Sequence, residues 1–234
     1  MDEDTNTETL SLVSLLTDVA GVLGAVRTLE EMADAVLDVL SQVISVEYTG
    51  FFLLDPEDGR LRLVGARGFE AKEREEAART ASERHPGWVV RTGQMLHVPD
   101  TDADPERKTQ DSSGRVTKIR SRLFMPVKAG TLCVGAYGFA AGRPHAFSET
   151  HLALLRYAAS LTGATYGRLV NERKLAQQLA LLEEKQRELL LLSSPVIELG
   201  EHTLALPIIG TVDRERARYM AEQLLFRVVS QRAR

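Results

Sequence analysis

The feature that most constrains this sequence is a helical pattern that runs over residues 148–192. Ser148 can cap its first turn, and Phe147 and Leu152 have the spacing of a hydrophobic staple. Pro195 ends the pattern, because the residue before a proline is disfavoured in the helical conformation. About 45 residues at ~1.5 Å each form a rod of roughly 65 Å, which is longer than one small core can cover. The helix is therefore expected to leave a folded domain and to extend beyond it.

The second half of this helix carries a coiled-coil pattern. Its apolar residues recur alternately four and three positions apart, and charged residues fill the other faces. One polar position within the repeat can fix the register of a pair of helices. Because the pattern covers only about two to three heptads, a homodimer held by this seam alone is expected to be weak. The predicted dimer seam consists of Leu175, Leu179, Leu182, Gln186 and Leu189.

The first half of the helix carries a ridge of small residues that includes Gly163 and Gly167. A glycine inside a helix costs up to ~1 kcal/mol relative to alanine, so two of them indicate close packing. Two partners fit this ridge equally: a neighbouring helix, or the sheet of the helix's own domain.

The composition is that of a soluble globular protein, with 44% hydrophobic and 26% charged residues among 234. A net charge of −4 gives no overall attraction to nucleic acid or to an anionic membrane. The sequence has no run of about 18 apolar residues, and its acidic start is the opposite of a signal peptide, so we expect a cytoplasmic protein. The single cysteine, Cys133, excludes an intrachain disulfide and a thiolate-rich zinc site.

Before the long helix, the periodicity of the apolar residues changes from helical to alternating. Thr28 and Glu31 form a capping-box pattern at the start of the second of two amphipathic helices. A turn at residues 55–59 separates two apolar segments and predicts a hairpin. His85-Pro86-Gly87 is expected to stop a charged helix. The expected elements are helices at 12–23, 28–40 and 71–84, strands at 47–54, 60–64, 95–98, 121–128 and 131–139, and a long loop at 100–120 that is typical of a lid. This order indicates an α+β domain with an antiparallel sheet flanked by helices.

Five short motifs follow one another in this part of the chain. They are Gly87-Trp88-Val89-Val90-Arg91-Thr92-Gly93, Val98-Pro99-Asp100, Arg120-Ser121-Arg122-Leu123-Phe124-Met125-Pro126-Val127, Cys133-Val134-Gly135-Ala136-Tyr137 and Pro144-His145-Ala146-Phe147. In this order they resemble a GAF domain over residues 10–168. The resemblance implies a small-molecule sensor that dimerises through its terminal helices and binds its ligand between the sheet and the lid. Because ligands of the family range from cyclic nucleotides to haem, bilins and small metabolites, it identifies neither a ligand nor a cofactor.

The sequence departs from the motifs of better-known GAF groups, and these differences narrow the range of possible functions. The chain has no Asn-Lys-Phe-Asp-Glu run, which argues against cyclic-nucleotide binding of the phosphodiesterase type. Cys133 is followed by Val134, whereas the cysteine that attaches a bilin is usually followed by histidine. A lone cysteine also lacks the resolving partner that a methionine sulfoxide reductase needs, so we expect no enzymatic activity. Cys133 fits best as a small buried hydrophobic residue.

Five residues are candidates for contacts with a ligand, each with a plainer alternative. Trp88, Phe124 and Tyr137 can line a pocket or belong to the core. His97 can ligate haem iron, or can be a surface or core histidine. Arg122 belongs to a basic set that can receive an anion under the lid or can balance nearby acids. The other members of that set are Arg115, Lys118 and Arg120.

The last part of the chain, residues 195–234, has a second pattern of two strands and a helix. Ser194-Pro195-Val196-Ile197, a run over residues 206–213, and Arg216 resemble the opening of a STAS domain, of the kind in stressosome proteins with a separate N-terminal sensor. The segment is incomplete, and Arg214 stands where family members often carry threonine, so no phosphoacceptor role is transferred. Its strands are expected at 196–199 and 203–209. Its helix has an apolar side that requires either more chain or a second copy to cover it.

The predicted organisation is a frayed start at 1–9, the GAF-like sensor at 10–168, a coiled-coil linker at 169–194 and a partial STAS-like α/β segment at 195–234. The favoured hypothesis is a cytoplasmic bacterial signalling regulator, in which a dimeric GAF domain senses a small molecule or redox state and moves a STAS output. Its expected partners are a second copy, STAS-domain proteins and a regulatory kinase. The alternative is a dimerisation scaffold that binds nothing. The sensor hypothesis predicts a cavity of several hundred Å³ with converging polar groups, and the scaffold hypothesis predicts a pocket filled by side chains.

Overall fold

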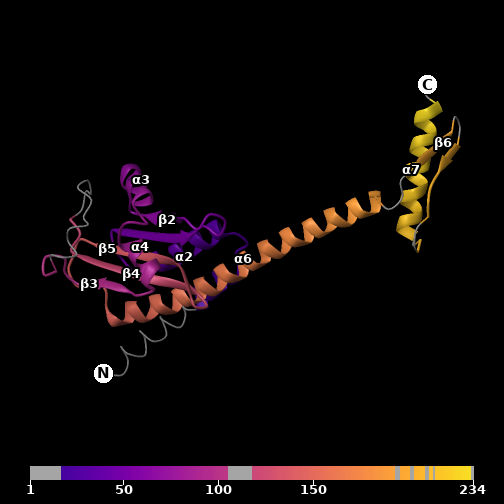
Figure 1. Ribbon diagram of the computed structural model, residues 1–234. Coiled ribbons are helices and arrows are strands. Elements are labelled where there is room, and N and C mark those ends of the chain that lie inside the picture. The colour runs from indigo at the N-terminus through magenta and orange to yellow at the C-terminus, as the bar shows by residue number, and fades with distance from the viewer. Residues whose placement is uncertain are drawn as a thin grey trace. The chain divides into compact units, whose positions relative to one another are not determined.

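The computed structural model describes residues 17–104, 118–192, 196–200, 203–208, 211–212 and 214–232 (Figure 1). The chain divides into two compact units, Met1–Asn171 and Glu172–Arg234. Within the described residues, the first unit contains a five-stranded sheet and the second a two-stranded hairpin. The predicted frayed start and part of the predicted first helix lie outside the described residues, and that helix is seen over residues 17–25.

The sheet of the first unit is antiparallel, with strand order β2-β1-β5-β4-β3. This arrangement confirms the α+β fold and both predicted hairpins, because β1 pairs with β2 and β4 pairs with β5. The second strand of each hairpin is longer than predicted. The strands are β1 Tyr48–Leu54, β2 Leu61–Arg67, β3 Leu96–Val98, β4 Ser121–Ala129 and β5 Leu132–Ala141.

Helix α2, Leu29–Val43, begins as its sequence predicts. The Thr28 side chain accepts a hydrogen bond from the amide of Glu31 at 3.1 Å. The carboxylate of Glu31 accepts from the amide of Arg27 at 2.8 Å, one residue before the expected partner of a capping box. Both bonds satisfy amides at the start of the helix, where the backbone has no helical partner.

Contrary to the prediction, His85-Pro86-Gly87 begins a helix instead of stopping one. Helix α3 covers Ala71–Arg79 and α4 covers His85–Thr92. Proline is tolerated in the first turn of a helix, because the backbone N–H group that it lacks would have no acceptor within the helix there. A Cβ atom on Gly87 would lie 2.0 Å from the carbonyl oxygen of Ser82, so only glycine allows the chain to turn so closely into α4.

The main core lies on one face of the sheet, where α2 and the first part of α6, Glu149–Leu192, pack against it (Figure 1). Phe51 and Tyr137 are fully buried there, with ring centroids 4.5 Å apart. The hydroxyl groups of Tyr137 and Thr162 are 2.6 Å apart, which gives both buried oxygens a hydrogen bond. The core therefore joins β5 directly to α6.

The start of α6 confirms the predicted cap and staple. The hydroxyl of Ser148 accepts from the amide of His151 at 3.2 Å, and the amide of Ser148 donates to Nδ1 of His151 at 3.3 Å. Phe147 and Leu152 are both buried. The helix continues to Leu192, as predicted, and the Ser193–Pro195 stop signal lies outside the described residues.

The glycine ridge on α6 packs against the sheet of its own domain. A Cβ atom on Gly163 would lie 1.9 Å from the carbonyl oxygen of Lys128 in β4. At Gly167 the nearest atom would be Cβ of Ala129, at an ordinary 3.8 Å. Of the two partners that fit the ridge, the sheet is thus the one seen at Gly163.

In the second unit, all residues from 172 to 189 on α6 are exposed, including the predicted seam leucines. The remaining elements are β6 Ile197–Gly200, β7 Thr203–Ala205 and α7 Arg214–Arg232. This is the predicted order, although β7 is shorter than expected. Neither the dimer seam nor the STAS resemblance is tested by these elements, and both stay predictions.

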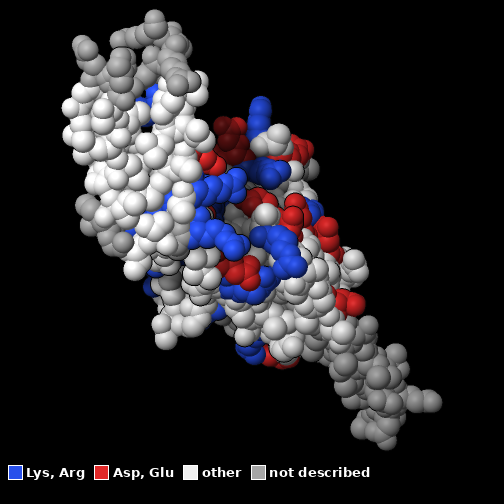
Figure 2. Space-filling model, turned by 90° about the vertical axis from the view of Figure 1, so that its right-hand side faces the viewer, with Lys and Arg blue, Asp and Glu red and all other residues white. Residues whose placement is uncertain are grey.

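Charged side chains of both signs lie close together on the face of the molecule in Figure 2. On the first unit, Arg62 pairs with Asp55 and Asp58, and Arg67 pairs with Asp34 and Asp38. Among the helices of the described segments, none combines the length and the apolar character that a membrane span requires.

Candidate ligand-binding site

The candidate site lies on the face of the sheet opposite the main core. Strand β5 places its large side chains in that core and its small ones, Ala136, Gly138 and Ala140, on the other face, because neighbouring residues of a strand point to opposite sides. Gly138 pairs with Gly50 on β1 and with Phe124 on β4. These small residues leave space above the middle of the sheet.

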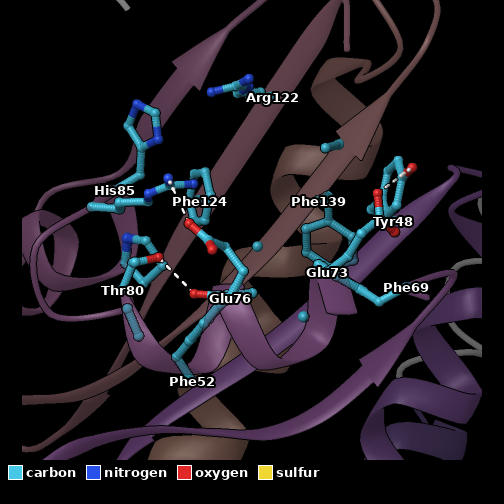
Figure 3. A pocket seen from close by; sticks show the side chains of 17 residues that line it. Tyr48, Phe52, Phe69, Glu73, Glu76, Thr80, His85, Arg122, Phe124 and Phe139 are labelled. Carbon is cyan, nitrogen blue, oxygen red and sulfur yellow. Dashed lines mark hydrogen bonds and ion pairs between the residues drawn. The ribbon is translucent and has the colours of Figure 1, made fainter. Parts of the chain in front are cut away.

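Helices α3 and α4 close this space into a cavity (Figure 3). Its volume is about 60 Å³, which is far below the several hundred Å³ that the sensor hypothesis predicted. The cavity-lining residues with aromatic or charged side chains are Tyr48, Phe52, Phe69, Glu73, Glu76, Arg84, His85, Arg122, Phe124 and Phe139.

Arg122 is the most deeply buried charged residue of the cavity, with 3% of its surface exposed. Burial, and secondarily the nearby charge of Arg84, lower the pKa of the Arg122 guanidinium to about 10. Arg84 itself forms an ion pair with Glu76 at 3.3 Å. The guanidinium of Arg122 is still charged at neutral pH, and a negative group beside it would offset both effects.

Glu73 provides a carboxylate that is held in place from two sides. One oxygen accepts from the amide of Glu70 at 3.0 Å, as part of the capping box that starts α3. The other accepts from the hydroxyl of Tyr48 at 3.3 Å. The ring of Tyr48 in turn meets Phe69 edge to face, with centroids 5.2 Å apart. A carboxylate and two aromatic rings therefore meet at this side of the cavity (Figure 3).

Phe124 lines the cavity beside the start of α4. Its ring stacks on His85, with centroids 5.3 Å apart, and covers the glycine below it. A Cβ atom on Gly138 would approach Cε1 of Phe124 to 2.6 Å. Glycine at this position therefore allows the ring to lie down on the sheet.

The structure brings together two of the five predicted ligand contacts, Arg122 and Phe124. Trp88 packs beside a small cluster formed by α4 and β3, outside the cavity lining. Tyr137 points into the main core on the opposite face of the sheet. His97 lies on β3 with its ring edge to face with Phe147, at 6.0 Å between centroids. Burial lowers the pKa of His97, and its Nε2 has no hydrogen-bond partner among the described residues.

The described ends of the predicted lid carry paired charges. Arg120 donates to both carboxylate oxygens of Asp100, at 3.1 and 2.8 Å, and Lys118 pairs with Asp102 at 3.1 Å. These pairs fit the alternative that the basic loop balances nearby acids. Residues 105–117, with Arg115, lie outside the described part of the chain.

Cys133 is buried, as interpreted from the sequence, and burial raises the pKa of its thiol. Its sulfur lies 3.4 Å from the carbonyl oxygen of Gly135 and 3.7 Å from that of Val89. Because the thiolate is the reactive form of cysteine, a raised pKa makes this thiol a poor nucleophile at neutral pH.

Sequence reasoning missed Tyr48, Glu73 and His85 as cavity residues. Glu73 lies on a helix that has no buried residue, so no apolar pattern indicates which side of α3 faces the sheet. A signal was available for Tyr48, because Tyr48, Gly50 and Phe52 alternate along β1 on the face that lines the cavity.

The GAF domain family model matches residues 26–165, more than half of the chain, and includes every element that lines the cavity. The chain therefore belongs to the GAF domain family, which is typical of sensor and signalling proteins.

Solved structures of low sequence identity share the fold. The GAF domain of a phosphoenolpyruvate-protein phosphotransferase from Coxiella burnetii has 16% identity and a TM-score of 0.58, over 70% of this chain and 98% of that one. The corresponding Acinetobacter domain has 16% identity and a TM-score of 0.57, over 70% and 94%. The free methionine-R-sulfoxide reductase of Neisseria meningitidis, solved with its substrate, has 20% identity and a TM-score of 0.55, over 69% and 91%. At these identities the similarity shows the fold alone. No curated protein sequence matches the chain.

Proposed function

We propose that this protein is the sensor part of a cytoplasmic bacterial signalling regulator, in which a small molecule binds in the cavity between the sheet and helices α3 and α4. The observation that carries the proposal is the convergence of a buried guanidinium, a fixed carboxylate and aromatic rings on one cavity. Ligand pockets typically combine apolar walls with a few such placed polar groups.

Strand β5 provides a route from the cavity to α6. Gly138 and Ala140 form the floor of the cavity, and Tyr137, the residue before Gly138, contacts α6 on the other face. A ligand that binds two arrangements of this strand with different affinity shifts the equilibrium between them. The output is a change in the pairing of α6 in a homodimer, passed to a STAS-like segment at residues 195–234. STAS-domain proteins and a regulatory kinase are the proposed partners.

A second candidate function is a dimerisation scaffold that binds no ligand. The small volume of the cavity favours it, because little space is left for a ligand.

Native mass spectrometry of the full chain, purified from its own host, separates the two candidates when combined with an absorption spectrum from about 300 to 700 nm. We expect a retained small molecule in the wild type and none in Ala140→Leu, whose larger side chain would fill the floor of the cavity between Tyr48 and Arg122. Circular dichroism checks that the variant is folded. A bare, colourless protein would support the scaffold instead.

A further inference from the structure

The cavity presents opposite charges from two different elements. Glu73 comes from α3 and Arg122 from β4, and Figure 3 shows them at different sides of the cavity. Strand register relates these sides, because Ala140 on β5 pairs with Tyr48 on one neighbour and with Arg122 on the other. With strands ~4.8 Å apart, the Cα atoms of Tyr48 and Arg122 are separated by roughly 10 Å. This separation is on the scale of a molecule a few bonds long.

The side with Glu73 has the chemistry of a cation site. Its carboxylate oxygens accept from Tyr48 and from the backbone, and each oxygen keeps a second lone pair that can accept from an ammonium group. The rings of Tyr48 and Phe69 stand beside it. A cation near aromatic rings is attracted by their electron density, and the attraction grows when water is excluded.

The side with Arg122 has the chemistry of an anion site. Its guanidinium is almost completely buried, and the charge of Arg84 acts on it as well. A guanidinium can donate two parallel hydrogen bonds to one carboxylate, and the pairing is stronger where the charge is poorly solvated. A bound carboxylate would relieve the cost of burying this charge.

The size of the cavity limits the ligand. A cavity needs a volume of about 10–15 Å³ to hold one water molecule. This cavity has a volume of about 60 Å³. The free space therefore holds roughly four to six waters, which corresponds to a molecule of about four to eight non-hydrogen atoms. A nucleotide, a haem or a bilin is several times larger.

We propose that the ligand is a small zwitterion, a free amino acid or a betaine, with its ammonium group at Glu73 and its carboxylate at Arg122. The inference rests on the proposed function, because it names the ligand class of that same cavity. It also accounts for a buried positive charge and a partly buried negative charge that line one space too small for a larger ligand.

Isothermal titration calorimetry of the full chain tests the proposal with four probes. Glycine betaine and 4-aminobutyrate carry both charges, choline carries only the cation, and butyrate carries only the anion. The variants are Glu73→Gln and Arg122→Gln. Their controls, Glu75→Gln and Arg74→Gln, remove the same charges from exposed positions of α3 outside the cavity lining.

We expect a zwitterionic probe to bind, and each cavity variant to weaken it about tenfold or more, because each removes one of the two protein charges that attract the ligand. The controls should change the affinity less than about twofold, since surface charges contribute little. Glu73→Gln keeps the proposal testable if Arg122→Gln fails to fold, because Glu73 is only partly buried.

The other outcomes separate this inference from the proposed function. A ligand retained from the host, or a probe, that carries a single charge and binds equally well to Glu73→Gln overturns the zwitterion while leaving the sensor function intact. Absence of both a retained ligand and binding by any of the four probes overturns both proposals and supports the scaffold.

Discussion

Two glycines one turn apart on α6 have opposite structural roles. A Cβ atom on Gly163 would collide with a backbone carbonyl, which cannot move without shifting β4, whereas Gly167 has room. We expect Gly163→Ala to lower the free energy of unfolding by about 2 kcal/mol or more. We expect Gly167→Ala to leave it unchanged or to raise it by up to ~1 kcal/mol, because alanine is the better helix former. Urea unfolding of both variants measures the difference, and equal effects would contradict this packing.

The burial of His97 leads to a prediction of how the free energy of unfolding depends on pH. Burial lowers its pKa below the ordinary 6.5, opposed by Glu149 and assisted by His145. The folded protein therefore binds this proton less tightly than the unfolded chain does. The contribution of His97 to stability is present above pH 6.5 and is lost as the pH falls through the lowered folded pKa. The free energy of unfolding of the wild type should fall more between about pH 7.5 and 5.5 than that of His97→Gln. Parallel pH profiles would show that His97 does not titrate in this way.

At the residue scale, sequence reasoning identified which residues are large or charged but not which face they occupy. Tyr137 and Gly138 are neighbours in the chain, yet one lies in the main core and the other on the cavity floor. Arg122 was found as a member of a basic set near the predicted lid. Glu73 was not, because it looks like any other acid of an exposed helix.

At the scale of elements, the predicted seam on α6 is open to a direct test. Leu179 and Leu182 are more than half exposed. We expect the double substitution Leu179→Asp with Leu182→Asp to abolish a homodimer, because two carboxylates on each helix would be buried against each other. Light scattering over a concentration series measures the molar mass.

The matched control is Ala180→Asp with Leu181→Asp, which adds the same charges at positions outside the 4-3 repeat. Leu181 is as exposed as the seam leucines. If the control dissociates as readily as the seam variant, or if the seam variant keeps the mass of the wild type, another surface holds the copies together.

Most elements could be predicted because local rules determine them. Alternation and turn residues located the two hairpins, and the Ser148 cap located the start of α6. The failure at α4 has a physical reason, since proline and glycine are signals of both a helix end and a helix start. Whether these residues end one helix or begin the next depends on how closely Gly87 packs against the backbone of Ser82. The sequence alone does not reveal this contact.

At the scale of the whole molecule, the two units differ in how much they bury. The first has a continuous core on one face of its sheet, whereas Met220 is the only buried residue among those the structure describes in the second. Amide hydrogen exchange should therefore be at least about a hundredfold slower in β4 and β5 than in β6 and β7 at low protein concentration. If a second copy covers the second unit, its protection should rise with concentration while that of β5 stays the same.

Strand β5 serves two purposes with alternate residues. Its small residues bound the ligand cavity, and its aromatic residues hold the sheet to α6. Changes at positions 138 and 140 can therefore alter what the protein binds without touching the contact between Tyr137 and α6, and a change at 137 does the reverse. During evolution, members of the family could acquire new ligands through one set of positions while the other set preserves the fold. Among homologous sequences, we expect the two sets to vary independently.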